Sequence, residues 1–124
     1  MIIDLNHVNI VTAKLDETRD FFTNVLGLTV GYRPDFGVPG WWLYAGDKPV
    51  VHLIAPAEGE AARPTPSPFD HAAFEIADAD EAMARLKQHG VTFRQFDAPD
   101  GRARQLFFRE PNGVTIELIA RRAA

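Results

Sequence analysis

Alternating apolar and polar positions divide the chain into short strands and two helices. The predicted strands cover residues 2–11, 28–32, 41–44, 50–54, 69–76, 91–96, 105–109 and 114–120. Helical patterns run from Asp16 to Leu26, with Thr12 or Asp16 as the cap, and from Asp80 to His89. Gly27 and Gly90 follow these helices as left-handed stops.

The order of these elements occurs twice. Residues 27–30 (Gly-Leu-Thr-Val) correspond to residues 90–93 (Gly-Val-Thr-Phe), and residues 51–55 correspond to residues 116–120. We expect one α+β domain over residues 1–124, with module one at 1–55, a proline-rich linker at 56–68 and module two at 69–124. Each module reads β-α-β-β-β and is too small for a stable core of its own. The two modules should therefore pack together, or against those of a second chain.

Composition excludes several classes of function. The chain has no cysteine, so disulfides, thiol catalysis and thiolate metal sites are excluded. A net charge of −4 argues against nucleic acid as a partner, because phosphate binding requires a basic surface. No apolar run is long enough to cross a membrane, and the N-terminus lacks a basic start followed by an apolar stretch. We therefore expect a soluble, cytoplasmic protein that meets no membrane.

The last predicted strand carries one carboxylate, Glu117, between apolar residues. In a pleated strand Thr115, Glu117 and Ile119 share one face, while Ile116 and Leu118 point to the other. If both faces are covered, Glu117 needs a partner, because an ionised carboxylate removed from water alone is very costly. The alternative is a surface carboxylate on a strand with one wet face.

The repeat superimposes His7 on His71 and His52 on Glu117. Each predicted sheet then offers one residue from its first strand and one from its last, and four nitrogen and oxygen ligands can converge on one divalent metal ion. Imidazole and carboxylate without thiolate suit Zn, Fe, Ni, Co or Mn, and an octahedral ion would keep two positions open. Taken singly, each histidine is equally explained as a hydrogen-bonded strand residue. His89 ends a helix, where it interacts with the helix dipole.

The chain resembles the vicinal oxygen chelate superfamily, which includes glyoxalase I, extradiol dioxygenases, methylmalonyl-CoA epimerase, fosfomycin resistance proteins and bleomycin-binding proteins. The resemblance covers nearly the whole chain and rests on residues 7–9 (His-Val-Asn), 21–28 (Phe-Phe-Thr-Asn-Val-Leu-Gly-Leu), 70–71 (Asp-His) and 107–118 (Phe-Phe-Arg-Glu-Pro-Asn-Gly-Val-Thr-Ile-Glu-Leu). It implies paired β-α-β-β-β modules forming half-closed, mixed-sheet barrels, and a homodimer. It also implies that His7, His52, His71 and Glu117 are the metal ligands.

The retained ligands favour an enzyme that binds the adjacent oxygens of a small carbonyl or enediolate-forming substrate. We expect glyoxalase- or epimerase-type proton transfer, with Glu117 as the catalytic base. Glyoxalase I typically has Glu at the position of His52, which departs from a strict glyoxalase pattern. An extradiol ring-cleaving dioxygenase using His7, His71 and Glu117, an antibiotic-resistance enzyme and a non-catalytic small-molecule binding protein are the alternatives.

Several other side chains are candidates for the substrate pocket. Phe36, Trp41, Trp42 and the loop at residues 33–40 can form an apolar wall, or the aromatic rings can fill the core. Asn9 and Glu75 share strand faces with His7 and His71, where they can support metal ligands. Three arginines can bind an anionic substrate tail or remain solvated: Arg94, Arg102 and Arg104.

Overall fold

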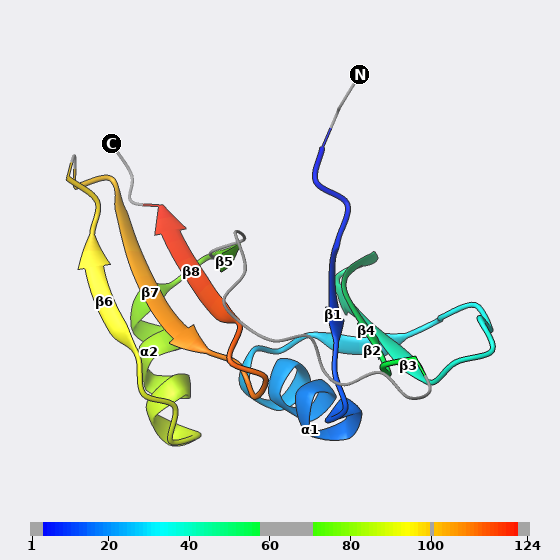
Figure 1. Cartoon of the computed structure of the whole chain (residues 1–124). Helices are drawn as coiled ribbons and strands as arrows, with labels where there is room; N and C mark the ends of the chain where they lie inside the picture. The colour runs from blue at the N-terminus through cyan, green and yellow to red at the C-terminus, as the bar shows by residue number, and fades with distance from the viewer. Residues whose placement is uncertain (1–3, 58–70, 100, 122–124) are drawn as a thin grey trace. The chain divides into compact units, whose positions relative to one another are not determined.

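The chain is described by a computed structural model that covers residues 4–57, 71–99 and 101–121 (Figure 1). It divides into two compact units, Met1–Pro66 and Ser67–Ala124. Unit 1 contains β1 (Val8–Val11), α1 (Leu15–Asp20), the π-helical turn η1 (Phe21–Val25), β2 (Thr29–Gly31), β3 (Gly40–Ala45) and β4 (Lys48–Ile54). Unit 2 contains β5 (His71–Ile76), α2 (Ala79–Gln88), β6 (Arg94–Asp97), β7 (Ala103–Arg109) and β8 (Thr115–Arg121).

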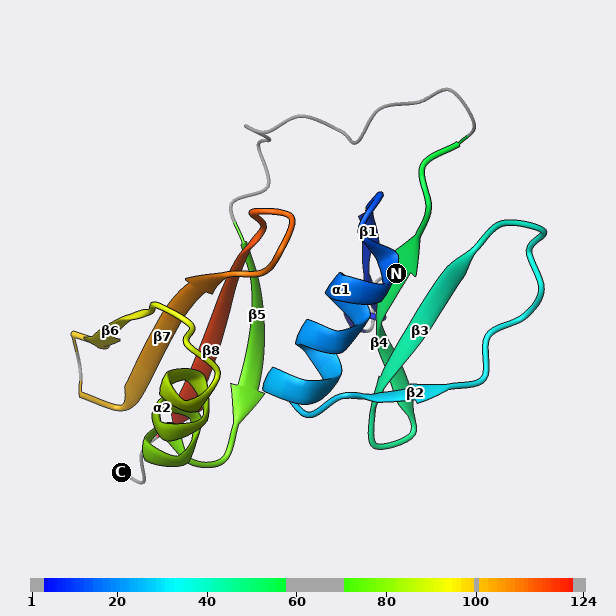
Figure 2. The ribbon, with the colours of Figure 1, turned by 90° about the horizontal axis from the view of Figure 1, so that it is seen from below.

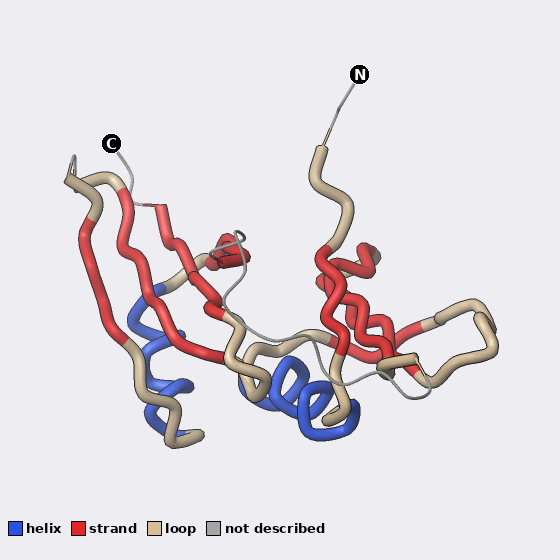
Figure 3. Tube along the Cα trace, in the orientation of Figure 1, coloured by secondary structure: helices blue, strands red, loops and turns tan. Residues whose placement is uncertain are grey.

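Both units have the same sheet topology. The strand order is β1-β4-β3-β2 in unit 1 and β5-β8-β7-β6 in unit 2, and in each the first strand runs parallel to the last while the other pairs are antiparallel. The strands of Figure 3 form two open four-stranded mixed sheets, neither of which closes on itself. The predicted α+β fold with a repeated β-α-β-β-β order is confirmed.

The strand register shows how closely the two halves correspond. Asn9 is the Cα partner of His52 across β1 and β4, and Ala73 is the partner of Glu117 across β5 and β8. His7 and His71 each stand two residues before these partners. The sequence alignment of His7 with His71, and of His52 with Glu117, therefore corresponds to equivalent positions in the two sheets.

One face of each sheet carries the apolar core of its unit. In unit 1, Val51 and Leu53 of β4 are buried on the side of α1, as is Phe22 of η1. In unit 2, α2 crosses the equivalent face of the sheet (Figure 2), and Leu86, Leu106 and Ile116 are fully buried. Because side chains alternate along a strand, His52 and Glu117 point to the faces opposite their helices.

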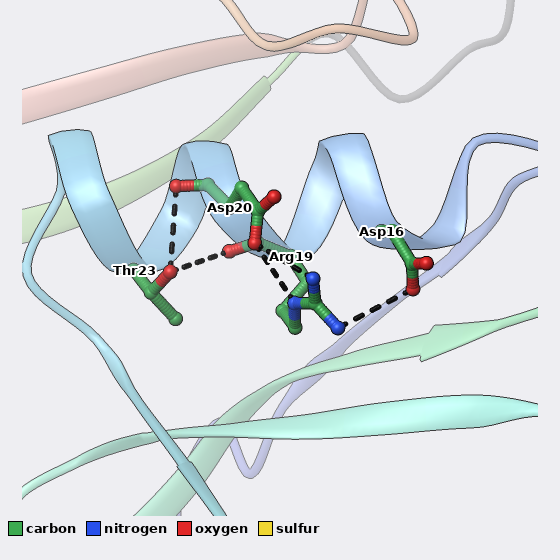
Figure 4. Close-up of polar contacts among 4 residues, drawn as sticks. All are labelled: Asp16, Arg19, Asp20 and Thr23. Carbon is green, nitrogen blue, oxygen red and sulfur yellow. Dashed lines mark hydrogen bonds and ion pairs between the residues drawn. The ribbon is translucent and has the colours of Figure 1, made fainter.

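Arg19 connects α1 to the sheet beneath it. Its guanidinium lies 4.6 Å from the ring centre of Trp41 and pairs with Asp20 at 2.9 Å and Asp16 at 3.3 Å (Figure 4). The hydrogen bond to Asp20 raises the pKa of Arg19. In Figure 4 the Thr23 hydroxyl also donates to the carbonyl of Arg19 at 3.0 Å, where the helix continues into η1.

The predicted element boundaries need several corrections. The strand expected at residues 2–11 is confirmed only at Val8–Val11, because the pairing with β4 begins at Val8; His7 precedes the strand and is not in its middle. Residues 2–3 of that prediction, residues 58–68 of the predicted linker and residues 69–70 of the strand expected at 69–76 lie outside the described residues. The strands expected from residues 28 and 91 begin at Thr29 and Arg94.

The predicted cap of the first helix is also wrong. Lys14 occupies the N-cap position without a side-chain cap, and Asp16 lies inside the first turn. The Thr12 hydroxyl accepts the backbone N–H of Lys14 at 2.8 Å, so it fixes the approach to the helix and not its first turn. The stops are confirmed: Gly27 and Gly90 have φ of 80° and 70°, values that favour glycine.

No helix in the described part of the chain is both long and apolar enough to span a membrane.

The turn before β8 is built on a buried carboxylate, Glu110, which is 3% exposed. Its Oε1 accepts the backbone N–H groups of Asn112 at 2.7 Å and Val114 at 2.9 Å, and its Oε2 accepts Asn112 Nδ2 at 2.7 Å. The backbone of Glu110 also pairs with that of Val114 and Gly113. These bonds set where β8 begins and therefore how its side chains alternate.

We expect Glu110→Ala to lower the free energy of unfolding by about 3 kcal/mol, because the substitution leaves two backbone N–H groups of a tight turn without an acceptor. Urea unfolding followed by circular dichroism measures the loss. Glu110→Gln keeps one oxygen, so its free energy of unfolding should lie between those of the unsubstituted protein and Glu110→Ala. Asp47→Asn, in the exposed β3–β4 turn, should change the free energy of unfolding little. An unchanged unfolding midpoint in Glu110→Ala would contradict this role.

Candidate functional site

In unit 2, Glu117 has the partner that its position in β8 demands. The residue is 6% exposed, and its Oε1 lies 3.0 Å from His71 Nε2. Its Oε2 accepts a 3.3 Å hydrogen bond from Gln105 Nε2 on β7. His71 is the first residue of β5, and its ring meets Phe107 edge to face with centroids 5.7 Å apart. The carboxylate thus sits between an imidazole and an amide on the face away from α2.

In unit 1, the equivalent position holds a stack of rings. The His52 imidazole lies between His7, with centroids 3.7 Å apart and planes 11° apart, and Trp42, with centroids 4.0 Å apart and planes 13° apart. His7 reaches this stack from the residue before β1, and Trp42 is the Cα partner of His52 across β3 and β4. The two histidines predicted to be ligands in this half are therefore side by side.

Each histidine of this stack has a polar group that orients its ring. His52 Nε2 lies 3.0 Å from the carbonyl oxygen of Pro49, and since a carbonyl only accepts, Nε2 carries the proton and donates. His7 Nδ1 donates to Asn6 Oδ1 at 2.8 Å. These two hydrogen bonds leave His52 Nδ1 and His7 Nε2 as the other ring nitrogens. Burial of the ring lowers the pKa of His52, and His7 and Arg33 lower it further, against the hydrogen bond to the Pro49 carbonyl, which raises it.

These pairs fit the donor requirements of a divalent metal ion. A metal-binding histidine generally donates its other ring N–H to a carbonyl or carboxylate, as His52 does to Pro49. Glu117 is a buried carboxylate that needs charge compensation, and the chain adds no thiolate. Over residues 4–57, 71–99 and 101–121, no group of three His, Asp or Glu side chains that could hold a metal ion is found. Each unit supplies two of the four predicted ligands.

A pocket of about 190 Å³ lies on the His52 face of unit 1. His52 and Trp42 form part of its lining, together with the loop after β2; the other lining residues are Asn9, Arg33, Phe36, Leu53 and Ile54. The Phe36 and Trp42 rings are 6.0 Å apart. This combination of aromatic walls with a few polar groups is typical of small-molecule sites.

The other sequence candidates divide between the two faces of the sheets. Trp41 belongs to the opposite face, under Arg19, and is not in the pocket lining. Glu75 pairs with Arg121 at 2.6 Å. Arg104 pairs with Asp97 at 3.2 Å, and the Arg94 guanidinium lies 5.8 Å from the ring centre of Phe96. These groups have local roles and do not join His52 or Glu117.

Two residues of the site were not singled out from the sequence. Gln105 shares a face with Phe107 by strand alternation, a signal that was present, but only the β7–β8 register puts it beside Glu117. Arg33 stands in the loop that was predicted to border the substrate, but no sequence pattern distinguishes it from the other arginines.

Comparison with known proteins places this geometry in a family. The model of the Glyoxalase/Bleomycin resistance protein/Dioxygenase superfamily matches residues 4–118. Glyoxylase I 4 of Arabidopsis thaliana is 28% identical over 122 residues, covering 94% of this chain and 70% of the relative. Glutathione transferase FosA of Serratia marcescens is 31% identical over 120 residues, covering 95% and 81%.

The fold is also found among solved structures. A glyoxylase/bleomycin resistance protein/dioxygenase domain from Frankia sp. EAN1pec superimposes with a TM-score of 0.80 at 19% identity, covering 100% of this chain and 96% of that one. The repeated sheets, the matched polar pairs and these similarities lead to one conclusion: the chain belongs to the Glyoxalase/Bleomycin resistance protein/Dioxygenase superfamily.

Proposed function

We propose that the protein is a divalent-metal-dependent enzyme of the glyoxalase lyase or isomerase type, acting on a small carbonyl compound with two adjacent oxygens. The observation that carries the proposal is the equivalence of two polar pairs. His52 and Glu117 occupy equivalent register positions in the two sheets, and the rings of His7 and His71 contact them on the faces opposite the helices. Packing alone gives no reason for both halves to place coordinating groups there.

The four residues His7, His52, His71 and Glu117 would hold one metal ion, of the Zn, Ni, Co, Mn or Fe group. When bound, such an ion acts as a Lewis acid on substrate oxygens. Two of these residues lie in unit 1 and two in unit 2, so the proposed site would need both units, of one chain or of two chains in a homodimer. A cytoplasmic homodimer that binds only a small molecule is the assembly we propose, in agreement with the module size.

Glu117 is the proposed base. Its Oε2 is the oxygen that Gln105 contacts, and an amide can serve either protonation state of a carboxyl group, since it has both donors and an acceptor. When the carboxylate is ionised, Gln105 Nε2 donates a hydrogen bond to Oε2. Once Oε2 carries a proton, the amide group rotates and its oxygen accepts a hydrogen bond from the carboxyl O–H. Gln105 is thus a positioning residue that keeps Glu117 aligned through a proton transfer.

We expect protein purified without chelator to contain one divalent metal ion per chain, measured by elemental analysis. His7→Ala and His71→Ala should each lower metal affinity by at least about tenfold, because each removes a ligand. His89→Ala, at the C-cap of α2, is the matched control and should retain the metal. Full metal content in both ligand variants would contradict the assigned site.

We expect Glu117→Gln to abolish turnover in a lyase assay with methylglyoxal and glutathione, because the amide cannot take up the proton. Gln105→Ala should lower kcat about tenfold while leaving KM within about twofold, since it disturbs the alignment of the base and not substrate binding. Gln105→Glu places a second carboxylate beside Glu117 and should be worse than alanine. Full activity of Glu117→Gln would exclude this residue as the base.

A second candidate is the transfer of glutathione to an electrophilic antibiotic. The observation that favours it is the 31% identity to a relative named glutathione transferase FosA. Product analysis separates the two activities: lyase chemistry converts the adduct of methylglyoxal and glutathione into an isomer, whereas transfer leaves a stable thioether. Bound iron with oxygen uptake on catechols would instead indicate a ring-cleaving dioxygenase, and absence of metal in freshly purified protein would favour a binding protein.

A further inference from the structure

Arg33 is a cation at the pocket of unit 1, where its guanidinium contacts an aromatic ring and a backbone carbonyl. Its guanidinium lies 5.1 Å from the ring centre of Phe36, and its Nη1 donates to the Val38 carbonyl at 3.1 Å. Within the described residues, no carboxylate pairs with it. The nearest acid in sequence, Asp35, instead accepts the backbone N–H of Gly37 at 2.8 Å.

The hydrogen-bonding capacity of Arg33 is only partly used. The Nε–H group is buried and finds no acceptor among the described residues, a situation that ordinarily disfavours a conformation. Gly40 makes room for the neighbouring Nη2, because a Cβ at that position would come within 2.7 Å of it and would also collide with the Leu53 carbonyl oxygen. The Nε and Nη2 edge is one of the two guanidinium edges that can form paired hydrogen bonds with an oxyanion.

We propose that Arg33 is the specificity residue of the site and binds the oxyanion of an acidic substrate, a carboxylate or a phosphonate, in the pocket beside His52. This inference rests on the proposed function, because it identifies the substrate class of that site. Arg33 lines this pocket, and the oxyanion supplies the acceptor that Nε lacks among the described residues. The rest of the substrate lies against Phe36 and Trp42.

The lining of the pocket adds polar groups to this cation. Asn9 provides an amide and His52 an imidazole on the same surface. A small organic acid with a carbonyl or hydroxyl group next to its charged end fits this arrangement of one cation, two polar groups and two aromatic rings.

The test compares charged and neutral probes on the metal-loaded full chain by isothermal titration calorimetry. Pyruvate and methylphosphonate carry an oxyanion, whereas hydroxyacetone has two adjacent oxygens and no charge. We expect Arg33→Gln to weaken binding of an oxyanion probe about tenfold to a hundredfold, and to leave hydroxyacetone within about twofold. The tighter of the two anions in the unsubstituted protein identifies the head group. Arg85→Gln, on the exposed surface of α2, is the control.

Two further measurements separate a binding role from a structural one. Arg33→Lys keeps the charge without the paired donors and should bind pyruvate with intermediate affinity. Nuclear magnetic resonance should show the Trp42 indole signal shifting with pyruvate while that of Trp41, on the opposite face, stays fixed. Equal weakening of charged and neutral probes, or no change in either, would overturn the proposal. If the protein contains its metal but pyruvate binding does not depend on Arg33, this inference alone is refuted. If the protein contains no metal but pyruvate binding still depends on Arg33, only the proposed reaction is refuted.

Discussion

The contact on which the site depends is the one between the buried Glu117 carboxylate and its two partners, His71 and Gln105. A carboxylate that is 6% exposed is tolerated only when its oxygens are satisfied, and these partners come from the strands on either side of β8. The register of the whole sheet is thereby constrained. A shift by one residue would turn Glu117 into the apolar face under α2 and put Ile116 or Leu118 in its place.

Unit 1 has different side chains at the equivalent position. The His7, His52 and Trp42 rings are stacked there, whereas in unit 2 the His71 imidazole contacts the Glu117 carboxylate. Burial of the ring lowers the pKa of His52, and the Pro49 carbonyl fixes which nitrogen carries the proton. The repeated framework therefore places two imidazoles at this position in unit 1, and an imidazole with a carboxylate in unit 2.

The family likeness and the pocket contribute different kinds of information. Similarity establishes the superfamily and its fold, but relatives named glyoxylase I and glutathione transferase FosA both match this chain, so similarity does not select the reaction. The pocket lining is particular to this chain. Arg33, held by Phe36 and the Val38 carbonyl, adds a fixed positive charge to a surface that is otherwise aromatic and neutral. Substrate selection is decided by such local groups.

The sequence by itself determined the repeated β-α-β-β-β order, the glycine stops at Gly27 and Gly90, and the matched positions of His7, His52, His71 and Glu117. These features follow from local patterns, because strand alternation, helix termination and internal repetition can each be recognised from the order of residues alone. Tertiary structure alone decided that Gln105 meets Glu117, that Trp42 covers His52 while Trp41 turns away, and that Arg33 reaches the pocket. Those contacts join residues from different strands and loops, and only the register of the sheet and the path of the loop specify them. The same reason explains why the start of β1 was predicted too early. A strand begins where its pairing with the neighbouring strand begins, at Val8 in β1, and not where the alternation of apolar and polar residues begins.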